Sequence, residues 1–384
     1  DYFVLARIDV RDNVTEYVED DRRLNGNNTW YTVETAKITL VPSDSPKPVT
    51  TLASVRADGS QGEALSEQPD MSQDGRYLVF STLSQLDPAD TDDNFDVYLR
   101  DHLTGEVRLL SNGNGNGTGG DAQYPAISAD GRYVVFQSDA GDLVAGDSNG
   151  HIDIFRVRLE TGQIRRVSVS AAGEQSNSSS FSPDISGDGR YVVFASQADN
   201  LAATPVSPGR THVYVHDAFD GTTSLVSFSL GGAEANGSSF APEISNNGAY
   251  VVFTSEATDI DPAVAPTSAR NVYRAQRAGS DGRLLSQLAG VAGNAYSYDP
   301  SISADGSIVA FVSEATNLDT TTPDTNGLPD IFIYDFSGPS LGRIISSDGN
   351  EFNLPSAESS GDVGALEPSI SADGRFVEIG RASC

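Results

Sequence analysis

The sequence predicts an all-β protein, a six-bladed β-propeller whose blades are four-stranded antiparallel sheets. A glycine-containing turn motif recurs six times along the 384 residues, at intervals of 56 to 68 residues. Each interval contains four short segments of β-strand composition, and sheets that stack face to face around a channel bury both of their faces. The last repeat ends two strands short, so we expect N-terminal strands to close the last blade.

Six similar segments define the repeats, and each places a turn glycine between two strands. These glycines are Gly75, Gly131, Gly189, Gly248, Gly306 and Gly374. The blade repeats accordingly start near residues 68, 124, 182, 241, 299 and 367. An Asp-Gly or Asn-Gly pair between two strands predicts a type I′ hairpin turn, which requires positive φ at both central residues.

Each repeat is expected to contain four strands in order, and repeat 2 illustrates them. A short strand at Pro125–Ser128 is followed by Tyr133–Ser138, whose YVVF run is apolar on both faces and is therefore expected to be buried on both. After a polar loop comes the third strand, Asp153–Arg158, and a Thr161-Gly162 turn leads to a fourth strand ending near Val167. The corresponding third strands are Asp96–Asp101, His212–Asp217 and Asp330–Asp335. A linear β-solenoid is excluded, because its repeats are shorter and lack repeated hairpins.

The N-terminal region is expected to supply the two strands that the last repeat lacks. The candidates are Thr32–Val41 and Pro48–Ser54, joined by a proline-containing turn. The expected domain limits are residues 31–384 for the propeller, within which residues 31–54 complete the last blade, and residues 1–30 for an appended strand or hairpin.

The repeat core resembles that of the TolB-like six-bladed propellers, which are built from PD40 repeats, a WD40-like unit. The resemblance is carried by P-x-I-S-x-D-G-R-Y-V-V-F at Pro125–Phe136 and Pro183–Phe194, and by D-[VI]-[YF] at Asp96–Tyr98, Asp153–Phe155 and Asp330–Phe332. It covers about residues 32–380. Relatives of this shape serve as periplasmic interaction scaffolds, as propellers attached to peptidases and occasionally as oligogalacturonate lyases. The resemblance therefore implies the fold, while function has to be argued from the site.

The charge balance argues against two classes of partner. The chain has 54 acidic and 24 basic residues, which give a formal net charge of -30. Such a charge repels nucleic acid and anionic lipid surfaces unless a local basic patch compensates, and the sequence alone reveals none. No apolar run reaches the roughly 18 residues of a membrane span. We therefore expect neither a nucleic-acid partner nor membrane insertion.

The loop before the third strand carries the strongest metal-binding motif. Its Asp and Asn residues recur at positions i, i+2 and i+6, a spacing that lets a tightly wound loop point several oxygens at one Ca²⁺ ion. No bidentate Glu follows as in an EF-hand, and the alternative is a set of Asx-turns in which the Asp opening the strand bonds the backbone. The expected ligands are Asp90, Asp92, Asn94 and Asp96 in repeat 1, Asp147, Asn149 and Asp153 in repeat 2, and Asp324, Asn326 and Asp330 in repeat 5.

Two further features locate candidate binding surfaces. Asp70, Asp184 and Glu243 occupy one position of the innermost strand, where they would converge on the channel and attract a cation or raise one another's pKa. The alternative is a water-filled channel with hydrated carboxylates. Antiparallel strand order also places all the long polar loops on one face, which we expect to be the binding face.

The sequence supplies no recognisable catalytic set. GxSxG, SxxK and HExxH motifs are absent. His212 and His216 form HxxxH, but on a strand they lie about 13 Å apart, too far to share an ion. We therefore expect a non-catalytic binding or scaffold module that recognises a protein or polysaccharide partner. The alternative is a carbohydrate-active enzyme, a polysaccharide lyase or glycoside hydrolase, that uses carboxylates on the same face.

The resemblance to the TolB-like propellers, together with the acidic composition, implies an extracellular or periplasmic setting, as part of an exported bacterial protein. The chain begins at Asp1 without a Met or an apolar signal segment, and its single cysteine, Cys384, excludes an internal disulfide. We expect a monomer or a module of a larger chain.

Overall fold

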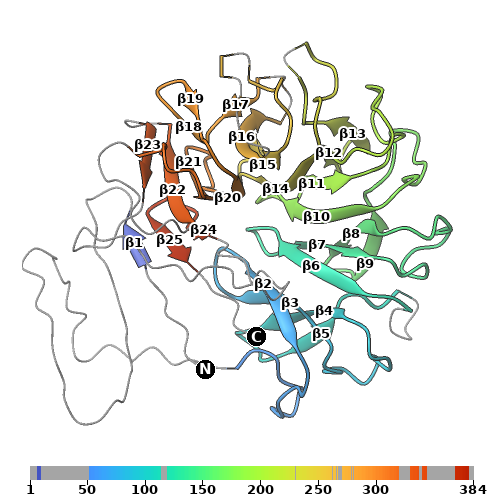
Figure 1. The fold of residues 1–384 in the computed structure, drawn as a ribbon. Coiled ribbons are helices and arrows are strands. Elements are labelled where there is room, and N and C mark those ends of the chain that lie inside the picture. The colour runs from blue at the N-terminus through green and yellow to red at the C-terminus, as the bar shows by residue number, and fades with distance from the viewer. Residues whose placement is uncertain are drawn as a thin grey trace, which may run out of the picture.

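Six β-sheets arranged around a central axis make up the protein (Figure 1). The computed structural model describes residues 7–9, 52–113, 119–229, 231–261, 270–277, 281–319, 329–336, 340–343 and 368–379, together with residues 263, 264, 266 and 279. All regular structure in this part of the chain is β-strand, so it contains no helix that could cross a membrane. The prediction of an all-β, six-bladed propeller is confirmed.

Five blades are complete four-stranded antiparallel sheets in sequence order. Blade 1 is β2 (Ser66–Met71), β3 (Tyr77–Thr82), β4 (Asp96–Asp101) and β5 (Val107–Leu109); blade 2 is β6 (Ala122–Ile127), β7 (Tyr133–Ser138), β8 (Asp153–Arg158) and β9 (Gln163–Arg166); blade 3 is β10 (Ser180–Ile185), β11 (Tyr191–Ser196), β12 (His212–Asp217) and β13 (Thr222–Leu225). Blade 4 is β14 (Ser239–Ile244), β15 (Tyr250–Ser255), β16 (Asn271–Gln276) and β17 (Arg283–Leu284); blade 5 is β20 (Ser297–Ile302), β21 (Ile308–Ser313), β22 (Asp330–Asp335) and β23 (Ser340–Arg343). A small hairpin, β18 (Gln287–Leu288) and β19 (Val291–Ala292), lies between blades 4 and 5.

The last blade is a three-stranded sheet of β24 (Pro368–Ile370), β25 (Phe376–Ile379) and the N-terminal β1 (Arg7–Asp9). An N-terminal strand thus pairs with the last repeat, as expected. The strand beside β25 is β1, which was expected as an appended element and instead belongs to the propeller sheet. Thr32–Val41 lies outside the described residues. An outer strand needs only an extended segment of alternating polarity, and the sequence ARIDV provides one.

The rest of the expected N-terminal pair lies mainly outside the described residues, which begin again at Leu52. The last positions of the expected strand Pro48–Ser54, Leu52 to Ser54, are not in a strand. Val55, directly after them, forms an isolated bridge with Gln61.

The core of five blades contains a stacked aromatic pair among buried aliphatic residues. The ring of the second strand stacks on that of the third at centroid distances of 5.9 to 6.2 Å in five blades. The pairs are Phe80 with Tyr98, Phe136 with Phe155, Phe194 with Tyr214, Phe253 with Tyr273, and Phe311 with Phe332. Such a pair contributes about 0.5–1.5 kcal/mol beyond the burial of its area. The expected third strands, β4, β8, β12 and β22, have the predicted bounds.

The hairpin turns between the first two strands differ from the expected type I′. All six turn glycines have positive φ, but the residue before each of them does not. In blade 3 the Gly189 N–H donates to the Ser186 carbonyl at 2.8 Å, and Asp188 Oδ1 accepts from the Ser186 hydroxyl and the Arg190 N–H. Because these side chains hold the turn, only the glycine needs a left-handed conformation.

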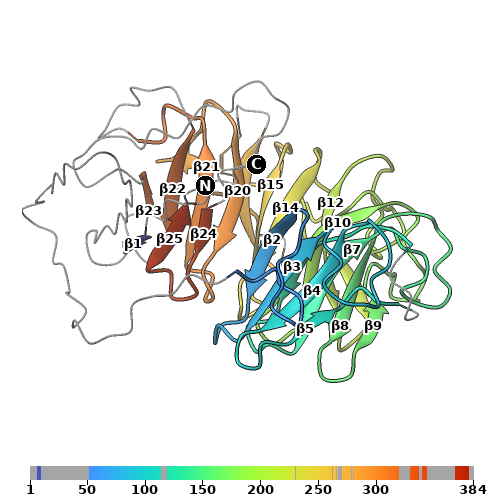
Figure 2. The ribbon, with the colours of Figure 1, turned by 90° about the horizontal axis from the view of Figure 1, so that it is seen from below.

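Neighbouring blades are joined through these turns. Backbone hydrogen bonds of 2.9 to 3.2 Å link successive turns from blade 1 to blade 6, for example Gly187 N–H to Asn246 and Ala304 N–H to Ala372. Each glycine from blade 2 to blade 6 also packs against the first residue of the preceding blade's second strand; a Cβ on Gly189 would lie 2.2 Å from Tyr133. Seen edge-on in Figure 2, the blades accordingly stand side by side.

Candidate metal centre

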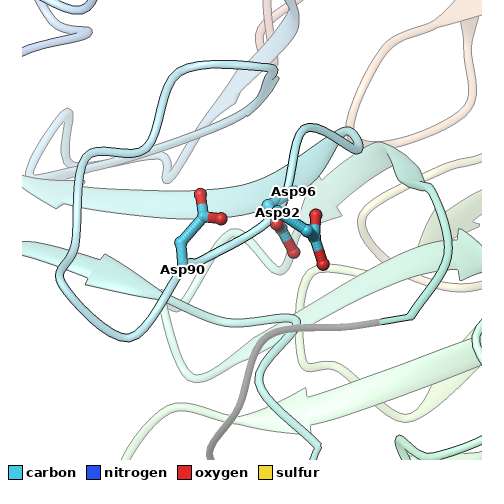
Figure 3. Close-up of side chains that lie close together, drawn as sticks. All are labelled: Asp90, Asp92 and Asp96. Carbon is cyan, nitrogen blue, oxygen red and sulfur yellow. The ribbon is translucent and has the colours of Figure 1, made fainter.

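Three carboxylates of the first blade gather in the loop between β3 and β4 (Figure 3). Asp90, Asp92 and Asp96 each offer an oxygen, and these oxygens all lie within 4.8 Å of one another. Asp90 is 5% exposed and Asp96 is 0% exposed, whereas Asp92 is half-buried. Asn94, the fourth residue of the predicted set, donates its backbone N–H to Asp92 Oδ1 at 2.9 Å and so shapes the loop.

The two carboxylate oxygens of Asp90 differ in their surroundings. Asp90 Oδ2 accepts a hydrogen bond from the Tyr98 hydroxyl at 2.6 Å, but Asp90 Oδ1 is buried and accepts none from the described residues. Burial, followed by the charges of Asp92 and Asp87, raises the pKa of Asp90 above its usual value. A buried carboxylate oxygen without a donor is costly, and a bound cation would offset that cost.

In the second blade, the equivalent loop surrounds the positively charged side chain of Arg166. Arg166 lies between the expected ligands, with Nη1 at 2.9 Å from Asp147 Oδ1 and 3.2 Å from Asp153 Oδ2. Asn149 donates its side-chain N–H to Asp153 Oδ2 at 2.8 Å. The Arg166 side chain is only 11% exposed, so the loop of blade 2 closes around it.

The two blades differ at one position of the fourth strand. Arg166 pairs with Phe155 across β8 and β9, while Leu109 pairs with Tyr98 across β4 and β5. Leu109 therefore occupies in blade 1 the place of Arg166 in blade 2. The cluster of Asp90, Asp92 and Asp96 has no guanidinium from this position.

The third predicted set belongs to blade 5. Asp324 and Asn326 lie outside the described residues, and Asp330 is the buried first residue of β22. The prediction for this loop stays a prediction.

The first residue of the third strand also has a structural role. Asp96 accepts a hydrogen bond from the Ser111 hydroxyl at 2.5 Å, and Asp153 accepts one from Ser168 at 2.5 Å. Asn271 accepts one from Ser286 in blade 4. The alternative interpretation expected this Asp to bond the backbone, whereas these bonds to Asp96 and Asp153 come from serine hydroxyls.

The carboxylates of the innermost strands connect neighbouring blades across the channel wall. Asp70 accepts from the N–H of Ile127, Asp184 from that of Ile244, and Glu243 from that of Ile302, at 2.7 to 3.2 Å. Burial raises the pKa of Asp184 to about 7, and burial followed by the charge of Asp184 raises that of Glu243 well above its usual value. These groups are hydrogen-bonded parts of the wall, and the channel is less negative at neutral pH than its carboxylates suggest.

A repeated β-bulge precedes these carboxylates and was not foreseen. The residue before the strand proline has a φ of 45° to 54° in five blades. The register of the first and second strands shifts across this residue and the proline. The residues are Gln68, Tyr124, Ser182, Ala241 and Asp299. The recurrent X-Pro pair was the available signal, because proline lacks the N–H of a regular ladder and is tolerated at bulges.

No family model matches the chain, and no curated protein does. Among solved structures, the chain is similar to a putative TolB from Agrobacterium tumefaciens, with 18% identity, a TM-score of 0.49, and coverage of 83% of this chain and 90% of that one. It is also similar to a structure from a study of two prolyl endopeptidases (16% identity, TM-score 0.45, 74% of this chain and 36% of that one). A tricorn protease gives 13% identity, a TM-score of 0.32 and coverage of 68% and 26%.

Proposed function

We propose that the chain is a non-catalytic binding module whose first blade holds a Ca²⁺ ion at Asp90, Asp92 and Asp96. The observation that carries this proposal is the buried, unpartnered Asp90 Oδ1 next to two further carboxylates. Ca²⁺ accepts six to eight oxygen ligands in flexible geometry, so backbone carbonyls and water can complete the shell. The set contains no His or Cys, which argues against zinc.

The position of the cluster connects the ion to the binding face. The loop from β3 to β4 and the loops between blades leave the same end of the strands, since the blades are antiparallel. An ion that orders this loop would stabilise the face on which we place the recognition of a protein or polysaccharide partner. Export to the extracellular or periplasmic space stays a prediction.

The carbohydrate-active enzyme remains the competing interpretation, and the described side chains do not favour it. Glycoside cleavage needs two suitably spaced carboxyl groups open to the substrate. Asp184 and Glu243, whose pKa values are raised, are instead engaged with backbone groups of the next blade. Burial lowers the pKa of His216 to about 4, which keeps this imidazole neutral inside blade 3.

Calcium is expected to raise the melting temperature of the chelator-treated protein. Binding to the folded state alone adds about 2.7 kcal/mol when calcium reaches 100 times its dissociation constant. Leu109→Arg supplies blade 1 with the guanidinium of blade 2, so this variant should lose the calcium response. Leu103→Arg makes the same change at a position that is 75% exposed and should keep it. The measurement is the melting temperature of the wild type and of both variants, in chelator and in millimolar calcium or magnesium.

Two outcomes would contradict the metal centre. One is a wild-type melting temperature that does not respond to millimolar calcium after chelation. The other is a response that Leu109→Arg retains in full while remaining folded, because the ion would then lie elsewhere.

Binding without turnover is the expected result with acidic and neutral polysaccharides. Retention of the protein on an immobilised polysaccharide, measured with and without calcium, tests recognition, while the appearance of reducing ends or unsaturated products tests turnover. Product formation that is abolished by Asp or Glu substitutions on the long-loop face would replace the binding module with the enzyme.

A further inference from the structure

A hollow of about 370 Å³ lies between blades 2 and 3, on the face of the short turns. Its lining includes Tyr133, Arg156, Arg158, Arg165, Arg190 and Phe219. Four of the chain's 24 basic residues thus converge on one site in a protein with a formal charge of -30. The volume is in the range of small-molecule sites, and the site is separate from the metal cluster, which lies at the opposite end of the strands.

Two of these arginines have no carboxylate partner. Arg158 pairs with Glu160, and Arg190 pairs with Asp217 and Asp220. Arg156 makes no ion pair with the described residues: it lies 3.6 Å above the Tyr133 ring, and its buried Nε has no hydrogen-bond partner among them. The side chain of Arg165, its cross-strand neighbour, is exposed and likewise forms neither a hydrogen bond nor an ion pair with the described residues.

The equivalent arginines of blade 4 show what normally satisfies this pair. Arg274 lies between the rings of Tyr250 and Phe336, 4.2 and 3.1 Å from their centroids, and donates to the Gly306 carbonyl at 2.7 Å. Arg283 donates to the Tyr334 hydroxyl at 2.7 Å. Between blades 4 and 5, aromatic side chains of blade 5 therefore occupy the space beside the two arginines.

Blade 3 lacks the residues that fill the interface. Ala218 and His216 stand at the positions of Phe336 and Tyr334, as the alignment of β12 with β22 shows. Alanine leaves the space of the phenylalanine ring open, and His216 is buried and directed to the Thr223 hydroxyl at 3.0 Å. The small Ala218 thus creates the hollow and leaves Arg156 and Arg165 unsatisfied.

We propose that this hollow binds a dianionic phosphate group, either free or esterified to a small sugar. Two guanidiniums without counter-ions match a group of charge near minus two, and planar guanidiniums donate paired hydrogen bonds to phosphate oxygens. Burial and then the charges of Arg165 and Arg158 lower the pKa of Arg156, as expected for a cation that lacks an anion. Asp188 also lines the hollow, but its carboxylate accepts hydrogen bonds from Ser186 and Arg190 of its own turn.

One side of the hollow also suits a sugar ring. Phe219 is 82% exposed, and the Arg190 guanidinium lies 5.3 Å from its centroid. An aromatic ring beside a phosphate-binding pair offers an apolar surface to the face of a sugar. The ester is therefore expected to bind more tightly than inorganic phosphate.

Calorimetric titration at low salt, with the chelator-treated protein, tests the site. The probes are inorganic phosphate, glucose 6-phosphate and, as the neutral control, glucose. We expect saturable binding of the two phosphates and none of glucose. Arg165→Gln and Ala218→Phe should each weaken binding at least tenfold. Ala218→Phe introduces into the hollow the phenylalanine that blade 5 has at the equivalent position, and it leaves the charge unchanged. Arg132→Gln removes an arginine that is 76% exposed and should leave the affinity unchanged.

The titrations answer two questions: whether the site binds phosphate at all, and whether the sugar of a phosphate ester adds to the affinity. Equal affinity for the two phosphates identifies free phosphate as sufficient, and tighter binding of the ester identifies the sugar contact; both support the site. Absence of saturable phosphate binding overturns the proposal, and so does binding that Arg165→Gln and Ala218→Phe leave unchanged. If Ala218→Phe does not fold, the surface substitution Arg165→Gln decides alone.

Discussion

Replacing Gly189 with alanine is expected to destabilise the propeller by roughly 2–5 kcal/mol, because strain and overpacking act together at this turn. The backbone has a φ of 72°, and the new Cβ would lie 2.2 Å from Cδ2 and 2.9 Å from Cγ of Tyr133. The tyrosine ring carries the Arg156 guanidinium at 3.6 Å, so a shift of the ring would also displace this contact. Urea denaturation followed by circular dichroism measures the loss.

Gly162→Ala is the matched control. Gly162 has a φ of 67° in the turn between β8 and β9, but a Cβ there would meet no atom within 4 Å. This substitution adds backbone strain without a clash, so it should cost about 1–2 kcal/mol. Equal losses for the two variants would show that the contact between the turn glycine and the preceding blade does not contribute to stability.

The strands of the blades could be predicted because their signal is local. Runs such as YVVF are apolar on both faces, and burial on both faces is what a blade between two others requires. The bounds of β7 and β8 therefore agree with the sequence. The turn type was wrong, because type I′ belongs to two-residue hairpin loops, whereas the longer segment of residues 186–190 separates β10 from β11.

The metal motif shows where spacing alone fails. The loops that start at Asp90 and Asp147 look alike in sequence, yet one gathers carboxylates around an unpartnered oxygen and the other surrounds a guanidinium. The difference lies at Leu109 and Arg166, which are 19 residues beyond the first loop residue in both repeats. Only the pairing of the third and fourth strands shows that these positions face the loop.

The arginine hollow was missed for a related reason. The four arginines between residues 156 and 166 are interrupted by other residues, among them Glu160, and do not stand out as a basic patch. The sequence also does not show that Arg190 of the next blade joins Arg156 and Arg165, nor that Ala218 leaves the space between them open. The position of Arg190 and the space beside Ala218 depend on contacts between side chains of neighbouring blades. The repeat pattern predicts that the blades are neighbours, but it does not predict these contacts.

Arg166→Leu is expected to destabilise the calcium-free protein by about 3–5 kcal/mol, the usual effect of removing one partner from a buried ion pair. Asp147 and Asp153 would keep their charges in a buried loop, while leucine recreates the arrangement of blade 1. Calcium should therefore restore much of the lost stability, because the substitution converts a loop with a built-in cation into a second metal site. Chemical denaturation in chelator and in millimolar calcium measures both effects.

Arg166→Lys is the matched control for charge. A lysine keeps a cation near Asp147 and Asp153 but lacks the planar guanidinium, so it should lose less stability and respond less to calcium. Unchanged stability in Arg166→Leu would mean that these ion pairs do not hold the loop. A large loss that calcium fails to reverse would mean that the loop oxygens cannot form a cation site, and the inference of a metal in blade 1 would then rest on Asp90 alone.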